Sequence, residues 1–140
     1  TEDSQENNIG YFSCKVEEAF YSKTIGKGFA KKATNGIFVI IKLSIINLTK
    51  RTELIGDSMF NLIDKEDYQY STSMIGTNSL LMSGEKTFGV YAKESQPKMP
   101  TNGYVVFEVP NEAEYLLQLC SNNQIRTIPL PNIKMLIEKV

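Results

Sequence analysis

The residue types that most often perform acid–base or nucleophilic chemistry are sparse in this chain. The sequence contains no histidine, which excludes Ser-His and Cys-His nucleophile pairs and removes the usual general base near neutral pH. Glu17 and Glu18 are adjacent, and neighbouring residues of a strand point to opposite faces, so these carboxylates cannot act together. Ser-Lys and other paired-carboxylate mechanisms stay formally open. We expect no catalytic residues, no enzymatic activity and no cofactor.

Three acidic residues close in sequence could gather oxygen ligands for Ca²⁺: Asp64, Glu66 and Asp67. The segment lacks the glycine and the distal bidentate Glu of an EF-hand loop. The alternative is a hydrophilic hairpin turn, because Asp is a common turn former. We favour the turn and keep the three residues as candidate metal ligands.

A basic segment surrounds one aromatic residue, Phe29, with four lysines: Lys23, Lys27, Lys31 and Lys32. A basic patch with an aromatic ring can bind single-stranded nucleic acid or an acidic polymer. Base binding usually takes several stacking aromatics, so we expect no nucleic acid partner. The lysines are candidate polyanion contacts, and for an exported domain the polyanion would be a teichoic-acid-like polymer or the bilayer surface. The alternative, which we favour, is a solvated loop with Phe29 packed onto the domain.

The elements that must position these residues are predicted to be strands. Turn-forming pairs such as Asn35-Gly36 and Asn102-Gly103 separate short runs rich in Ile, Val, Phe, Tyr and Thr. This pattern is typical of a β-sandwich or barrel. The expected strands cover residues 11–21, 36–48, 57–64, 68–73, 85–92, 103–109, 115–120 and 124–128. Residues 22–34 and 94–102 read as exposed connections, and residues 74–83 are ambiguous, with a helical turn as one alternative.

The run from Gly36 to Leu48 is the clearest strand. One face is fully apolar and the other is mixed, as expected for a central strand with one face in the core. The apolar face carries Ile37, Val39, Ile41, Leu43 and Ile45. In the strand at 11–21, Glu18 interrupts the alternation, which indicates a bend there.

The bulk properties fit one domain. The chain has 140 residues with a net charge of −1, so no global field favours nucleic acid or an anionic membrane. No apolar run approaches the ~18 residues of a membrane-spanning helix. Residues 1–8 contain no apolar residue and read as a flexible leader, with a single domain over residues 9–140. A signal peptide or a lipid-anchored Cys could have preceded the leader.

Several segments together resemble a known family. They are Gly36–Leu43 ending at Asn47-Leu48-Thr49, Phe60–Asp64 with Tyr70 after it, and Gly103–Pro110 followed by Tyr115-Leu116-Leu117. Their order resembles a family of uncharacterised secreted proteins and lipoproteins, mostly of Gram-positive bacteria. The family's fold is similar to that of the mycobacterial immunoprotective extracellular antigen, an immunoglobulin-like sandwich. The family usually has Gly in the turn after the Asp strand, and Asp67 stands near that place.

This resemblance implies an all-β fold, an immunoglobulin-like antiparallel β-sandwich of about 7–9 strands, and an exported location. First and last strands of such a sandwich are often neighbours, so Cys14 and Cys120 could form a disulfide if their Cα atoms lie within about 7 Å. Closing so long a loop would contribute roughly 4 kcal/mol in the chain-entropy model. The alternative is two buried thiols, which we favour because a core of this size needs no bridge.

The function we expect is a non-enzymatic secreted or cell-surface interaction domain. Its partner would be an unknown protein or a cell-surface polymer, and open sheet edges make a homodimer an option. The location would be extracellular or at the cell surface, lipid-anchored or secreted, with the membrane contacted only through a removed anchor or signal. The alternative is an extracellular carrier domain that binds a small ligand or a cation.

Overall fold

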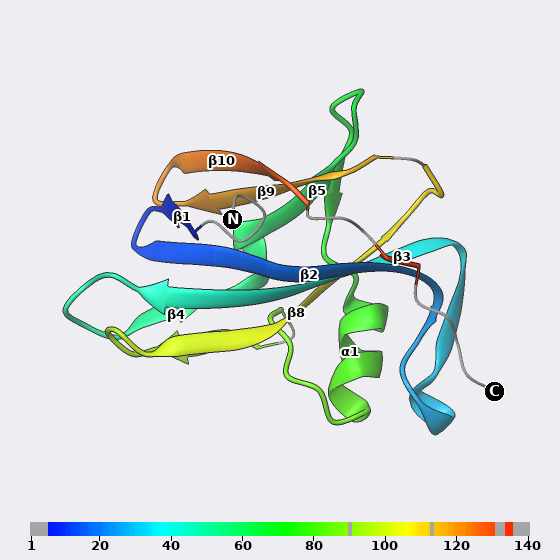
Figure 1. Ribbon diagram of the computed structural model, residues 1–140. Coiled ribbons are helices and arrows are strands. Elements are labelled where there is room, and N and C mark those ends of the chain that lie inside the picture. Colours follow the sequence, from blue (N-terminus) through cyan, green and yellow to red (C-terminus); the bar gives the residue numbers. More distant parts are fainter. Residues whose placement is uncertain (1–5, 90, 113, 131–133, 136–140) are drawn as a thin grey trace.

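The computed structural model describes residues 6–89, 91–112, 114–130 and 134–135 (Figure 1). One sheet has the order β1 (Glu6–Ile9), β2 (Phe12–Ile25), β3 (Lys32–Asn47) and β8 (Pro100–Val109), and the short β11 (Lys134–Met135) pairs with β2 in parallel. The second sheet has the order β10 (Gln124–Pro129), β9 (Leu116–Ser121), β5 (Phe60–Ile63) and β6 (Gln69–Ser71). A small third sheet pairs β4 (Glu53–Ile55) with β7 (Lys93–Ser95). The short helices are η2 (Gly28–Ala30), η3 (Asp57–Met59) and α1 (Met74–Met82).

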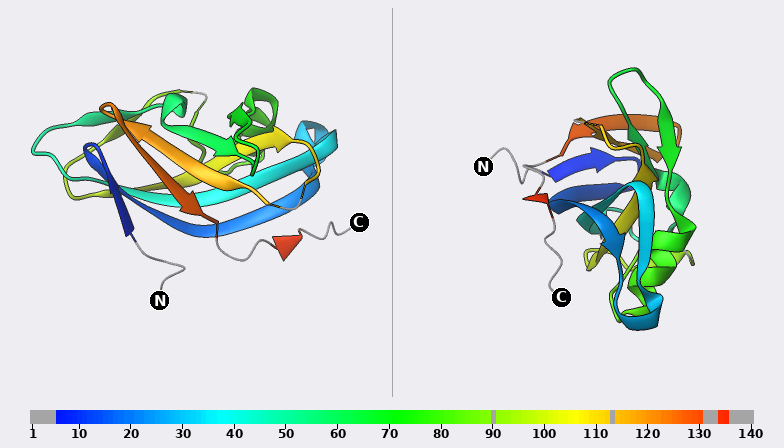
Figure 2. Two further views of the ribbon diagram at one scale, coloured as in Figure 1. Left: turned by 90° about the horizontal axis from the view of Figure 1, so that it is seen from above. Right: turned by 90° about the vertical axis from the view of Figure 1, so that its right-hand side faces the viewer.

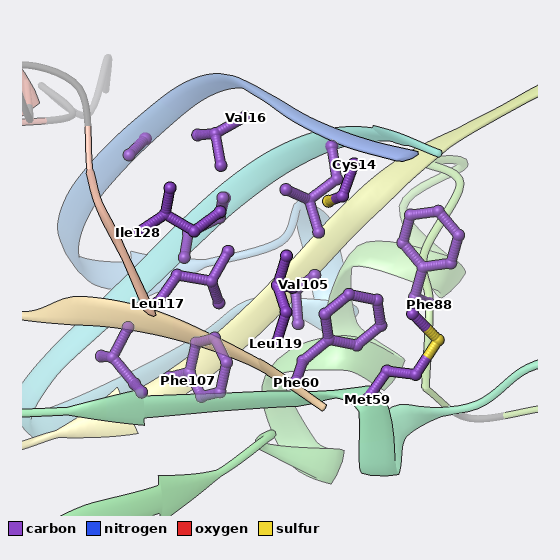
Figure 3. Packing of buried hydrophobic residues seen from close by; sticks show 14 of the residues in the cluster. Cys14, Val16, Met59, Phe60, Phe88, Val105, Phe107, Leu117, Leu119 and Ile128 are labelled. Atoms are coloured by element: carbon purple, nitrogen blue, oxygen red, sulfur yellow. The ribbon is translucent and has the colours of Figure 1, made fainter. Parts of the chain in front are cut away.

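The predicted all-β sandwich is confirmed, with more strands than the seven to nine expected. The two larger sheets pack face to face and enclose the main apolar cluster. Figure 3 shows side chains of both sheets meeting in this cluster, with Val16 and Val105 from one sheet and Leu117 and Leu119 from the other. The alternation of apolar residues at period two places one face of each strand in this core.

Strand β3 is buried on both faces. The predicted apolar face, Ile37 to Ile45, lies in the main cluster. On the opposite face Phe38 and Ile40 form a second cluster with Ile25 and Val106, against which Leu80 of α1 packs. Helix α1 therefore covers the outer face of the first sheet, so the ambiguous segment 74–83 is a helix that serves as a third layer.

The connection expected at residues 22–34 is wrong for most of its length. Strand β2 continues to Ile25 and β3 starts at Lys32, so the two form a long hairpin closed by η2. The bend expected near Glu18 is a β-bulge: the register shifts between Val16 and Glu18, which lets Ala19 return to the core. A bulge adds one residue and restores the alternation after it.

Three further expectations differ from the structure. Residues 85–92 form no strand within the described positions. Thr87 makes only a single β-bridge, to Tyr104, which lies on the outer edge of β8. Residues 94–102 are not only a loop, since β7 ends at Ser95 and β8 begins at Pro100. Strand β1 begins at Glu6, inside the expected leader, and residues 1–5 lie outside the described residues.

Within the described residues, no helix is long and apolar enough to cross a membrane.

The close approach of α1 to the sheet gives a stability prediction. An added Cβ at Gly76 would lie 2.6 Å from Cγ1 of Val106 and 3.3 Å from Phe38. Gly76→Ala should therefore lower the free energy of unfolding by about 1–3 kcal/mol, although alanine is the better helix former. Gly56→Ala is the matched control, because its Cβ would meet nothing within 4 Å. Urea unfolding measures both, and equal midpoints for the two variants would show that α1 does not rest on the sheet.

Candidate functional site

An open groove lies at one end of the sandwich, with a volume of about 690 Å³. It is formed by the turn between β1 and β2, by β4 and η3, and by the turn between β9 and β10. Figures 1 and 2 show the two turns close together at the left-hand end of the molecule. Its lining includes Tyr11, Leu54, Met59, Asn122, Asn123, Gln124 and Ile125.

The local conformation of the β9–β10 turn comes from its two asparagines. Asn122 and Asn123 both have positive φ, at 52° and 63°. Two successive left-handed residues match the twist of a two-residue hairpin, and Asn tolerates this conformation. The Gln124 side chain accepts a hydrogen bond of 3.0 Å from the Gly10 amide, which ties this turn to the β1–β2 turn. The two turns therefore hold one wall of the groove in place.

The groove combines apolar side chains with neutral amides. Leu54 is 62% exposed and Ile125 is 68% exposed, although both belong to strands. The Arg51 guanidinium lies 6.0 Å from the Tyr11 ring centre and forms a 2.9 Å ion pair with Glu53. This cation, beside the lining residue Tyr11, is thus paired with a carboxylate. The arrangement offers apolar contact and hydrogen bonding, with little net charge.

In the acidic turn, the Asp64 side chain accepts hydrogen bonds from backbone amides of the same turn. One carboxylate oxygen of Asp64 accepts hydrogen bonds of 2.9 Å from the amides of Glu66 and Tyr68. Asp67 adopts a positive φ of 68°, the conformation for which a glycine would be the usual residue. Among the residues that the structure describes, no group of three or more acidic, His or Cys side chains is placed to hold a metal ion. The structure does not bring Asp64, Glu66 and Asp67 together as ligands.

Two tyrosines lie next to this turn. The Tyr70 and Tyr115 rings meet edge to face with centres 6.1 Å apart. The Tyr115 hydroxyl donates a hydrogen bond to the carbonyl oxygen of Pro110, an arrangement similar to the tyrosine corner of immunoglobulin-type sandwiches. Burial raises the pKa of Tyr115, and the negative charge of Glu112 raises it further. Burial also raises the pKa of Tyr70. Both tyrosines therefore stay protonated near neutral pH, and the Tyr115 hydroxyl acts as a structural donor.

The two cysteines are free thiols, so the disulfide alternative is not realised. They lie in different sheets: Cys14 points into the core, while Cys120 follows the outward positions of β9 and lines the groove. Side chains that point apart in this way cannot be bridged without moving the backbone. Burial raises the pKa of the Cys14 thiol to about 12. Cys120 is half-buried, near the Asn61 and Gln118 amides, so only one of the two cysteines is in the core.

The four lysines lie along the β2–β3 hairpin, at the other end of the molecule from the groove (Figure 1). All four are exposed, and Lys23 donates a 2.8 Å hydrogen bond to the Gly36 carbonyl. The expectation that Phe29 packs onto the domain is wrong, because its side chain is fully exposed, at 102% of the reference area.

Sequence reasoning did not find the groove, because its lining comes from segments far apart in the chain. Tyr11, Leu54 and Ile125 belong to three different turns or strands. The one local signal is an aliphatic residue at an outward strand position, such as Ile125 in β10, where every residue from Gln124 to Thr127 is exposed.

These features define a β-sandwich domain with an end groove. A family model described as a domain of unknown function (DUF4352) matches residues 4–125, and the chain belongs to this family. No curated protein matches the chain.

Solved structures show the same fold. The yjhA protein of Bacillus subtilis has 13% identity and a TM-score of 0.67, covering 91% of this chain and 96% of its own. A conserved hypothetical protein of Bacillus anthracis has 15% identity and a TM-score of 0.67, covering 91% and 93%. The ycdA protein of Bacillus subtilis, described as a predicted lipoprotein, has 12% identity and a TM-score of 0.64, covering 91% of this chain and 38% of its own.

The two thiols should differ in reactivity. Because thiolates are the reactive species, Cys14 with its pKa of about 12 stays protonated at pH 8 and buried, whereas Cys120 borders open solvent. We expect iodoacetamide to modify Cys120 alone in the folded protein and both residues in denaturant. Peptide mass spectrometry after alkylation checks this. Modification of Cys14 before Cys120 would contradict the placement of β2 in the core.

Proposed function

We propose that this chain is a non-catalytic binding domain of an exported protein, and that its end groove binds an extended segment of a protein partner. The observation that carries the proposal is the exposed aliphatic pair, Leu54 and Ile125, beside a row of amide side chains in the groove. Exported location is supported by the fold shared with the lipoprotein-like ycdA. Similarity to the mycobacterial antigen stays a prediction.

The lining favours a peptide over a charged polymer. Aliphatic and aromatic side chains take up apolar side chains of a partner, and the amides of Asn123 and Gln124 can pair with its peptide groups. A polymer of sugar phosphates needs cationic side chains, but the lining contains neither Lys nor Arg. Arg51, beside Tyr11, is paired with Glu53 at 2.9 Å. The groove is also open, whereas small-ligand sites bury most of their ligand. Nothing in the described part of the chain favours the carrier alternative.

The chemistry of the lining also supports a role without catalysis. Its ionisable side chains are Tyr11, Glu53 and Cys120. Glu53 is held by Arg51, and the sequence supplies no histidine to act as a base toward Cys120. A thiol nucleophile needs such a base or a cation that lowers its pKa.

Photo-crosslinking in the native cells tests the groove. A benzophenone amino acid at position 125 should give a discrete crosslinked species that the same group at Lys65, on the exposed acidic turn, does not give. Leu54→Asp, introduced alongside the crosslinker at 125, should reduce that species about tenfold, because it places a charge in the apolar contact. Identical crosslinks from positions 65 and 125, or no effect of Leu54→Asp, would overturn the peptide-binding role.

Location is tested separately. Protease added to intact cells should remove the domain from a blot, because an exported domain is accessible outside the membrane. The controls are an intact cytoplasmic marker and cleavage of the purified domain under the same conditions. Survival of the domain with both controls satisfied would contradict export while leaving the groove experiment unaffected.

A further inference from the structure

Helix α1 exposes four of its five large apolar residues, and only Leu80 packs against the sheet. The residues that it buries against the sheet are small, namely Gly76, Thr77 and Ser79. Its exposed residues are Met74, Ile75, Asn78, Leu81 and Met82. Their spacing of i, i+1, i+4, i+7 and i+8 places them on one face of the helix. Met82 is 75% exposed. A helix usually turns its apolar stripe inward, so this outward stripe is a candidate contact surface.

The β2–β3 hairpin ends beside the C-terminal end of α1. Figures 1 and 2 show the hairpin end and the helix next to each other, below the sheets in Figure 1. The Lys27 amide donates a 2.9 Å hydrogen bond to the Ser83 hydroxyl. The Ser79 hydroxyl contacts the carbonyl oxygens of Ile25, at 3.0 Å, and Ala30. These bonds fix the hairpin end, with Phe29 at its apex, to the helix.

We name the residues gathered at this end the tip surface: Lys27, Phe29, Lys31, Lys32, Leu81 and Met82. The three lysines are exposed, and no acidic residue occurs between Glu18 and Glu53. Helix α1 carries no charged residue. Glu85, half-buried, is the nearest acidic residue in sequence after the helix. The tip surface therefore combines protruding apolar side chains with positive charge.

We propose that the tip surface docks onto an anionic lipid bilayer, with Phe29 inserted at the headgroup level. Aromatic and aliphatic side chains partition into the interface, and lysines around them are attracted by anionic headgroups. Lys27 and Lys32 lie close in sequence to the inserting ring, on the hairpin end that is hydrogen-bonded to α1, so insertion and charge attraction act together.

The shape and charge of the tip surface favour a lipid bilayer over other binding partners. Phe29 is fully exposed at the apex of a hairpin, and a protruding ring suits a soft surface that closes around it. A second copy of this chain would bring two sets of lysines together without intervening carboxylates, and like charges repel. The tip surface lies at the end of the molecule opposite the groove (Figure 1), so docking leaves the groove accessible. The inference does not depend on the proposed function.

The sequence contains no tryptophan, so Phe29→Trp in the full chain supplies a single fluorescent reporter. With vesicles of phosphatidylglycerol and phosphatidylcholine in equal parts, its emission should shift to the blue and be quenched by brominated acyl chains. With pure phosphatidylcholine the shift should be much smaller, because the charge attraction is lost. Tyr68→Trp, at the exposed acidic turn, is the matched control and should show neither effect.

Vesicle co-sedimentation of unlabelled variants completes the test. Phe29→Ser should lower the partition coefficient about tenfold, and the double change Lys27→Gln with Lys32→Gln should lower it by about the same factor on anionic vesicles. Ile125→Asp, in the groove, should leave it unchanged. All of these side chains are exposed, so unfolding midpoints should stay at the wild-type value.

Two results would overturn the proposal. One is binding of Phe29→Ser and of the lysine variant equal to that of the wild type. The other is an absence of binding of the wild type to the anionic vesicles. If the protein then forms a concentration-dependent dimer, measured by light scattering, that Phe29→Ser abolishes, the tip surface is assigned to self-association.

Discussion

Strand β3 must bury side chains on both of its faces, and the rest of the architecture follows from this constraint. Its Ile37-to-Ile45 face needs the second sheet, and its Phe38–Ile40 face needs a separate cover. Helix α1 provides that cover, and it can approach closely because Gly76 has no side chain to hold it off Val106. The position of α1 in turn fixes the end of the β2–β3 hairpin. The burial of both faces of β3 thus determines where the end of the β2–β3 hairpin lies.

The parts of the fold that could be predicted from the sequence are those set by local alternation. Strands β3 and β8 have a clear period of two, and the interruption at Glu18 correctly indicated an irregularity. The hairpin end was missed because its glycines and lysines look like a solvated loop, whereas backbone pairing across β2 and β3 holds it. The strand predicted at residues 85–92 was wrong because the side-chain types are those of a strand while the backbone is not paired as one. Phe88 has the side chain of a strand residue and is buried, but the chain makes one bridge to β8 instead of a ladder.

The candidate sites were predicted less well than the fold. The composition of a segment gives its charge, but it does not give the direction in which the side chains point. The four lysines were expected to be exposed and are exposed, but the full exposure of Phe29 at the hairpin end was not expected. The groove depends on Tyr11, Leu54 and Ile125 meeting across more than a hundred residues of sequence. The acidic turn was easier, since an Asp side chain that bonds amides two and four residues ahead is a local arrangement.

The Ser79 hydroxyl, between the carbonyl oxygens of Ile25 and Ala30, has a consequence for how the molecule opens. The helix cannot leave the sheet without breaking a bond to the hairpin, and the hairpin end cannot open without exposing the helix. We therefore expect the two segments, separated by some fifty residues of chain, to open as one cooperative unit in the native-state ensemble. Their backbone amides should exchange with solvent deuterium at a common rate. A bound surface or partner that restrains the apex of the hairpin should therefore also slow exchange along the whole of α1.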